Sequence, residues 1–129
     1  MGRTSSAARQ MTLILVAIAG AGGCVVRFLG EYLVRRHNPT MRPWATVVAN
    51  AVGCGIAGLA TYRLIGHVDA HLKSVIITGF CGGLTTFSSA LAIPAILQRQ
   101  HHWGYSVALV LTTPLLCSAF FVLGMALAH

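Results

Sequence analysis

The sequence predicts an all-α membrane protein with four transmembrane helices, the third of them broken near its middle. The chain is 56% hydrophobic and 9% charged, whereas a soluble domain is about 25% charged. Four long apolar runs are joined by short polar connections. Since a membrane-spanning helix needs roughly 20 apolar residues, a chain of 129 residues has room for four spans and no second domain.

Residues 1–10 form a polar N-terminal tail, and residues 11–129 form a single four-span domain. The first span covers about residues 11–34. Four glycines punctuate it, and small residues let helices approach closely where lipid provides no hydrophobic drive for association. These expected contact points are Gly20, Gly22, Gly23 and Gly30.

The second span begins at Pro43 and Trp44 and ends near Leu64. Proline suits a first helical turn and tryptophan suits the membrane interface. Small and polar residues recur along this span near one helix face. They are Asn50, Gly53, Cys54 and Gly58.

The third span covers about residues 74–97 and contains the run TGFCGGLTTFSS at residues 78–89. We expect the helix to be interrupted at residues 82–86. Non-helical chain survives within a membrane only where it is buried in protein or lines a wet cavity, so we expect the function here. The fourth span begins at Trp103, whose ring with that of Tyr105 marks the interface, and it ends near Leu127.

The formal charge of +7 comes from basic residues scattered mostly at span ends. No Arg-rich helix accompanies them, so we expect anionic lipid headgroups as partners and no nucleic acid. The loop charges are balanced, which is typical of insertion in both orientations and also compatible with one weakly biased topology. Arg3, Arg9, Arg63 and Lys73 lie on one side, and Arg35, Arg36, Arg42 and Arg99 lie on the other.

Catalytic and metal-binding motifs are missing from the sequence. The cysteines fall in four different apolar runs and form no C-x-x-C pair, so they are interpreted as packing residues. A lipoprotein signal ending at Cys24 is the alternative there, but the apolar run continues past it. No nucleophile–base pair is evident, and histidines such as His67 lie in loops or at the terminus, so we expect no enzyme.

Two polar side chains stand out within the spans. Arg27 lies deep in the first span, where a charge costs roughly 2.5 to 3.5 kcal/mol. It either snorkels toward the headgroups or sits at the wet mouth of a pathway, and we favour the second. Asn50 either bonds a neighbouring helix or offers N–H groups to an anion without adding a charge.

The glycine–threonine run suggests ion ligands. An opened helix at Gly82 and Thr85 leaves carbonyl oxygens for a small hard cation such as Na⁺, the alternative being a simple glycine kink. Ser88 adds a hydroxyl donor, and the ring edge of Phe87 is electropositive and can face an anion.

Three segments together resemble the Fluc-type (CrcB) fluoride channels of bacteria: GGCVVRFLG at 22–30, NAVG at 50–53 and TGFCGGLTTFS at 78–88. The resemblance implies a multi-pass protein of the inner (plasma) membrane, built as an antiparallel dimer with two fluoride pores and a central structural Na⁺. Backbone carbonyls of Gly82 and Thr85 would bind Na⁺. The implied fluoride pathway comprises Asn50, Phe87, Ser88, Thr86, Tyr105 and Thr113, with Arg27 near a vestibule.

Two positions depart from the family pattern. Ala90 stands where a second phenylalanine is usual, and Ile93 stands where an acidic residue is usual. The chain is therefore either a homodimeric channel or one subunit of a heterodimer whose own pore is impaired. The rival classes are a small multidrug-type transporter, for which Glu31 lies too close to Arg35, and a membrane scaffold.

Fluoride is strongly hydrated, so a selective path must replace its water with donors, as potassium filters replace water with carbonyls. The resemblance and these donors predict a passive channel that exports cytoplasmic fluoride and lowers its toxicity. Apart from Glu31 the spans hold no carboxylate that might relay protons, which argues against a proton-coupled exporter.

Overall fold

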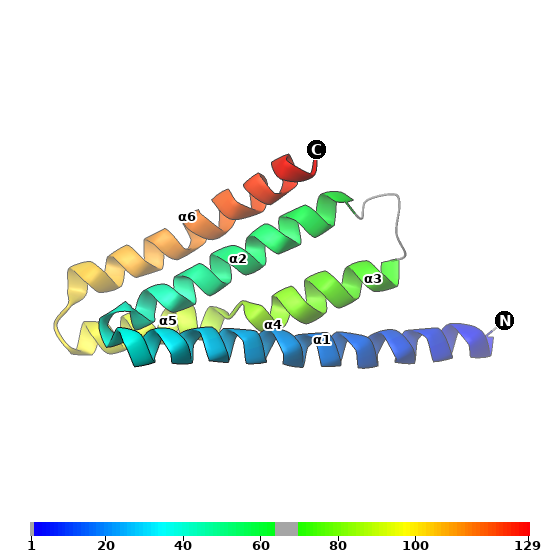
Figure 1. The fold of residues 1–129 in the computed structure, drawn as a ribbon, viewed down its shortest axis with the longest axis horizontal. Coiled ribbons are helices and arrows are strands. Elements are labelled where there is room, and N and C mark those ends of the chain that lie inside the picture. The colour runs from blue at the N-terminus through cyan, green and yellow to red at the C-terminus, as the bar shows by residue number, and fades with distance from the viewer. Residues whose placement is uncertain (1, 64–69) are drawn as a thin grey trace.

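The computed structural model describes residues 2–63 and 70–129, and every element in these ranges is helical (Figure 1). The elements are α1 (Gly2–His37), η1 (Pro39–Met41), α2 (Arg42–Arg63), α3 (Ala70–Ser74), the π-helix η2 (Val75–Cys81), α4 (Gly82–Leu84), α5 (Phe87–Arg99) and α6 (Trp103–Ala128). The predicted end of the second span at Leu64, together with the predicted loop residue His67, lies outside the described residues.

Four helical stretches are long and apolar enough to cross a membrane, which confirms the predicted all-α, four-span class. These stretches are Ser6–His37, Pro39–Arg63, Ala70–Arg99 and Trp103–Ala128. The N-terminal residues differ from the predicted polar tail in being helical, because α1 already begins at Gly2. Alanine, arginine and glutamine are good helix formers, so residues 7–10 continue the helix instead of ending it.

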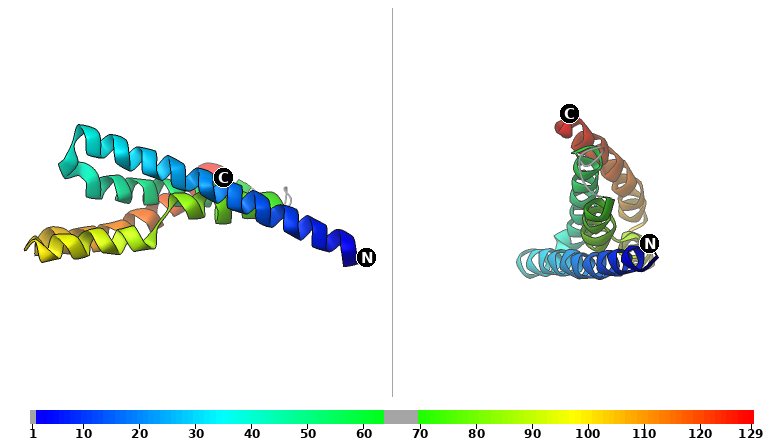
Figure 2. Two further views of the ribbon diagram at one scale, coloured as in Figure 1. Left: turned by 90° about the horizontal axis from the view of Figure 1, so that it is seen from below. Right: turned by 90° about the vertical axis from the view of Figure 1, so that its right-hand side faces the viewer.

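The third span is divided between two neighbours. Its first part, η2 and α4, packs against α1, whereas α5 packs against α6. The longest interface joins α2 and α6, which run side by side (Figures 1 and 2). Helix α2 also contacts α1, η2, α4 and α5, so it is the central helix of the subunit.

Glycines allow the closest approaches between helices. A Cβ on Gly83 would collide with the carbonyl of Gly20 in α1, and one on Gly124 would collide with the carbonyl of Gly55 in α2. Gly23 is confined in the same way by the backbone of Phe80, but Gly22 and Gly30 would meet nothing within 4 Å. The predicted contact stripe of the first span is thus reduced, within this chain, to Gly20 and Gly23.

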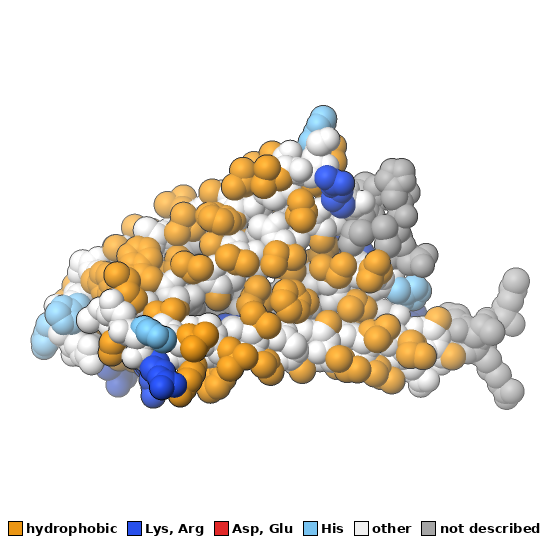
Figure 3. Space-filling view, viewed as in Figure 1, with side chains coloured by type: hydrophobic (Ala, Val, Ile, Leu, Met, Phe, Trp, Pro, Cys, Tyr) orange, Lys and Arg blue, Asp and Glu red, His pale blue; other side chains and the backbone are white. Residues whose placement is uncertain are grey.

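The surface is mainly apolar along its length. Figure 3 shows hydrophobic side chains over most of one face, with Lys and Arg side chains mainly near its ends. Large residues of α1 such as Leu13, Ile14 and Phe28 are exposed. A lipid bilayer or another membrane subunit would cover such a surface, so the exposure agrees with a membrane-spanning protein.

Candidate functional site

The chain leaves helical geometry at two threonines between α4 and α5. Thr85 has φ −87° and ψ 148°, and Thr86 has φ −147° and ψ 122°, so both are extended. The prediction placed the interruption at residues 82–86, but Gly82 is helical, with φ −62° and ψ −37°. The reason is that Gly83 is held against α1, while the N–H and the hydroxyl of Thr85 both donate to the Cys81 carbonyl at 2.9 Å.

The amide of Asn50 holds this break open. Its Oδ1 accepts a hydrogen bond from the Thr86 N–H at 2.9 Å, and its Nδ2 donates to the Thr86 carbonyl at 3.3 Å. Asn50 is buried, so it supplies the partners that the missing helical turn would have supplied. A primary amide has two N–H donors, which leaves one N–H beyond the bond to Thr86.

Thr86 also starts the next helix. Its Oγ1 accepts from the Ser89 N–H at 3.4 Å, as an N-cap residue does. The same hydroxyl shares a hydrogen bond of 3.0 Å with the Ser88 hydroxyl. The break is therefore a cluster of linked hydroxyl and amide groups at the N-terminus of α5.

A pocket of about 490 Å³ opens beside the break. We call it the Asn50 pocket. Its walls come from α2, the two threonines, α5 and α6. The lining residues are Asn50, Cys54, Thr85, Thr86, Phe87, Ala90, Leu91, Val110, Thr113, Pro114 and Cys117. These lining residues include no Asp, Glu, Lys, Arg or His, so the polar groups at the wall are neutral hydroxyls, thiols and one amide.

The structure brings together four of the predicted pathway residues in this pocket: Asn50, Thr86, Phe87 and Thr113. Ser88 is joined to them through its bond to Thr86. Phe87 is 80% exposed, so this subunit leaves most of its side chain uncovered. The predicted ligand Thr85 lines the same pocket.

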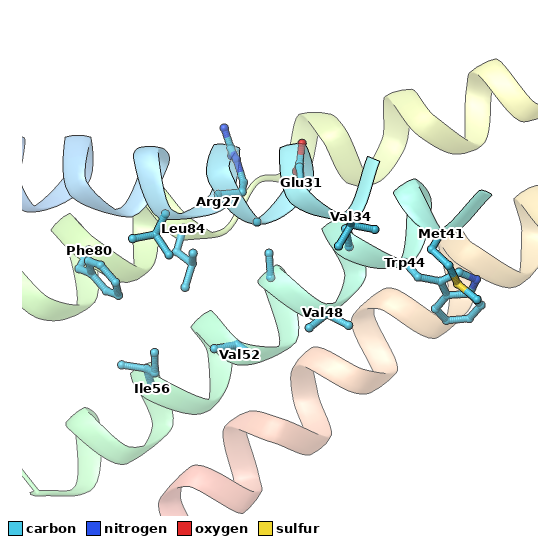
Figure 4. A pocket seen from close by; sticks show the side chains of 14 residues that line it. Arg27, Glu31, Val34, Met41, Trp44, Val48, Val52, Ile56, Phe80 and Leu84 are labelled. Atoms are coloured by element: carbon cyan, nitrogen blue, oxygen red, sulfur yellow. The ribbon is translucent and has the colours of Figure 1, made fainter. Parts of the chain in front are cut away.

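Arg27 lies elsewhere, in a second pocket of about 460 Å³. Figure 4 shows its side chain leaving α1 on the same side as that of Glu31. Val48 and Val52 of α2 line this second pocket. At 3.6 residues per turn they lie on the face of α2 opposite to Asn50, so α2 separates Arg27 from the Asn50 pocket.

Tyr105 lies at neither pocket wall. Its ring packs edge-on against Trp44, with centroids 6.4 Å apart. Beside it in α6, the Ser106 hydroxyl donates to the Pro94 carbonyl of α5 at 2.8 Å. Tyr105 therefore belongs to an aromatic contact between α2 and α6 in this chain.

Cys54 and Cys117 also line the Asn50 pocket, although both were interpreted as packing residues. Cys54 had been placed on the same helix face as Asn50, and the spacing of Cys117, four residues after Thr113, is the signal that was not used. Residues four apart share a helix face. The apolar part of the wall consists of Leu91, Val110 and Pro114, and no spacing in the sequence links these residues to Asn50.

Comparison with known proteins places the chain in a family. Residues 14–125 match the family described as CrcB-like protein, Camphor Resistance (CrcB). The chain is 33% identical over 115 residues to the fluoride-specific ion channel FluC of Sulfurovum sp. (strain NBC37-1), an alignment that covers 89% of this chain and 91% of the relative.

Two further relatives are similar over a somewhat shorter part of the chain. The fluoride-specific ion channel FluC 1 of Mycolicibacterium paratuberculosis is 36% identical over 103 residues, covering 78% of this chain and 77% of the relative. FluC of Salmonella arizonae is 38% identical over 103 residues, covering 77% and 79%. The protein therefore belongs to the CrcB-like family.

Proposed function

We propose that this protein is a subunit of a fluoride-specific ion channel in the bacterial inner membrane, where it lets cytoplasmic fluoride leave passively. The observation that carries the proposal is the similarity to channels of that name, which extends over most of both chains. The Asn50 pocket supports it, because its polar groups are neutral. These relatives carry the names of ion channels, in agreement with the prediction that the chain is not an enzyme.

The proposed fluoride donors are the second N–H of Asn50, the hydroxyls of Thr86 and Ser88, and the ring edge of Phe87. Neutral donors replace the water of a small anion without trapping it, and conduction needs binding that is weak enough to release the ion. Thr113 joins them only if its hydroxyl rotates, since it donates to the Leu109 carbonyl at 2.7 Å.

The backbone at the break supports the proposed Na⁺ site. In an unbroken helix the Gly82 carbonyl would accept from the Thr86 N–H, but that N–H donates to Asn50. The Thr85 carbonyl would likewise accept from the Ser89 N–H, which donates to Thr86 Oγ1 instead. Both carbonyls proposed as ligands are thus deprived of their helical donors, and carbonyl oxygen is a ligand that hard cations prefer.

We propose that the functional unit is a dimer of antiparallel subunits. The exposed ring of Phe87 and the apolar surface of α1 suit a covering subunit, and the balanced loop charges suit opposite orientations. Ala90 lines the Asn50 pocket where the family pattern has a phenylalanine. That feature favours the second candidate, a heterodimer in which a related subunit provides the complete pore.

Fluoride efflux from liposomes tests the proposal directly. The purified protein is reconstituted in liposomes loaded with fluoride or chloride, and the external anion is followed with an ion-selective electrode. We expect fluoride efflux without chloride efflux, and no efflux from protein-free liposomes. A chain that fails to conduct fluoride both alone and with a related subunit from the same genome would refute the proposed function.

A further inference from the structure

Two thiols lie on facing helices in the wall of the Asn50 pocket. Cys54 belongs to α2 and Cys117 to α6, and both are partly accessible residues of the pocket lining. Helices α2 and α6 pack side by side, so the two cysteines line the same pocket from adjacent helices. Each thiol stands one helical turn beyond a predicted pathway residue, Cys54 beyond Asn50 and Cys117 beyond Thr113.

The helices that carry these thiols are held at a short separation. A Cβ at Gly124 would collide with the backbone of Gly55, the neighbour of Cys54 in sequence. One at Gly58 would collide with the Phe121 carbonyl. Gly58 and Phe121 follow Cys54 and Cys117 by one helical turn each, so this close approach brings the two cysteine positions near each other across the α2–α6 interface.

Two thiols near each other define the class of ligand. Thiolates prefer soft cations over hard ones, and Cu⁺, Ag⁺ and Hg²⁺ accept two thiolates as a complete ligand set. A tetrahedral zinc site needs more ligands, and within residues 2–63 and 70–129 no three His, Cys, Asp or Glu side chains form a metal-binding group.

We propose that Cys54 and Cys117 form a two-thiolate site for a soft metal cation, and that a bound cation closes the neighbouring fluoride pathway. On binding, each thiol releases its proton to water and forms one metal–sulfur bond, so no electrons are exchanged. The closing effect rests on the proposed channel function. The cation fills part of the pocket one turn from Asn50, and Ag⁺ or Cu⁺ bound by two thiolates forms a complex with one net negative charge, which repels an anion that must pass beside it.

The other two cysteines provide matched controls. Cys24 is exposed on α1, where its thiol donates to the Gly83 carbonyl at 3.4 Å, and it does not line the Asn50 pocket. Cys81 is buried in η2 and is also absent from the pocket wall. Each of these cysteines is a single thiol that can bind silver by itself, but neither lies in the wall of the Asn50 pocket.

The test uses Ag⁺ in nitrate medium free of chloride. Native mass spectrometry of the detergent-solubilised protein counts silver ions that survive an excess of a monothiol, which strips silver from isolated cysteines. We expect the full chain and Cys24→Ser to retain one silver ion per subunit. Cys54→Ser and Cys117→Ser should each retain none, because a single thiol loses the competition.

Fluoride efflux is measured on the same proteins. Ag⁺ should abolish most of the flux of the full chain and of Cys24→Ser, a dithiol should restore it, and Cys54→Ser and Cys117→Ser should conduct in the presence of Ag⁺. Cys54→Ala replaces the serine variant if the latter elutes as an aggregate. Silver retention without loss of flux would overturn the closing role, and retention by both serine variants would overturn the paired site. A chain without flux before silver is added would refute the channel function, while the silver count still tests the thiol pair.

Discussion

Replacing Asn50 by alanine is the most informative perturbation of the site. Asn50→Ala removes two hydrogen bonds to the Thr86 backbone, of 2.9 and 3.3 Å, and leaves that N–H and carbonyl without their partner. Interhelical hydrogen bonds in membranes contribute on average about 0.6 kcal/mol, and about 1.7 kcal/mol at most. The variant should therefore lose about 1 to 3 kcal/mol of stability. It should also lose its fluoride flux, because the proposed pathway loses its amide donor.

The stability is measured by reversible denaturation in mixed micelles, the proposed dimer by its elution volume, and the flux in liposomes. We expect the variant to dimerise as the unmodified chain does, because the substitution removes little packing area. Asn38→Ala is the matched control, since Asn38 is exposed and its Oδ1 accepts the neighbouring Thr40 hydroxyl at 2.6 Å, a contact distant from the break. It should leave flux and stability nearly unchanged. Unaltered flux in Asn50→Ala would remove Asn50 from the pathway, and unaltered stability would refute its role at the break.

Three further predictions concern packing, sodium and assembly. Gly83→Ala should destabilise the subunit by about 1 to 3 kcal/mol through overpacking against α1, whereas Gly22→Ala, with open space around it, should not; equal denaturation midpoints would contradict this. Na⁺ should raise thermal stability relative to K⁺, by about 2.7 kcal/mol at one hundred times Kd. A Cβ has room at Gly82, so Gly82→Val should fold. It should no longer be stabilised by Na⁺ and should dimerise poorly. A variant that dimerises normally and is still stabilised by Na⁺ would exclude the cation site. If the chain works only with a different subunit, it should conduct poorly alone and Ala90→Phe should raise its flux, with folding checked in parallel; robust flux from the unmodified chain would exclude an obligate heterodimer.

The four spans were predictable because their signal is local. A run of about 20 apolar residues identifies a membrane helix by itself, and Trp103 marked the start of α6 correctly. The start of α1 was harder, because Ala7, Ala8 and Arg9 are compatible with either a tail or a helix. An apolar run identifies the part of the chain that lies in lipid, but the polar sequence before it does not tell a helix in water from a coil.

The details of the break depended on contacts distant in sequence. Glycine is a poor helix former, so Gly82 was the natural place to expect an opening. In the structure Gly83 is confined by Gly20 of α1, and Asn50 bonds Thr86, which lies 36 residues away. Neither partner is visible in a local pattern, so the sequence indicated the segment and not the two residues that leave the helix.

The paired bonds of Asn50 also fix which end of its amide is available. A 180° turn of the amide would point an N–H at the Thr86 N–H and the amide oxygen at the Thr86 carbonyl, breaking both bonds. The oxygen is therefore oriented toward the backbone N–H, and the amide keeps a second N–H that its bond to Thr86 does not use. A freely turning asparagine would serve cations with its oxygen as readily as anions with its hydrogen. In this protein one extended residue removes that ambiguity, so the amide offers an N–H to an anion although the site carries no charge of its own.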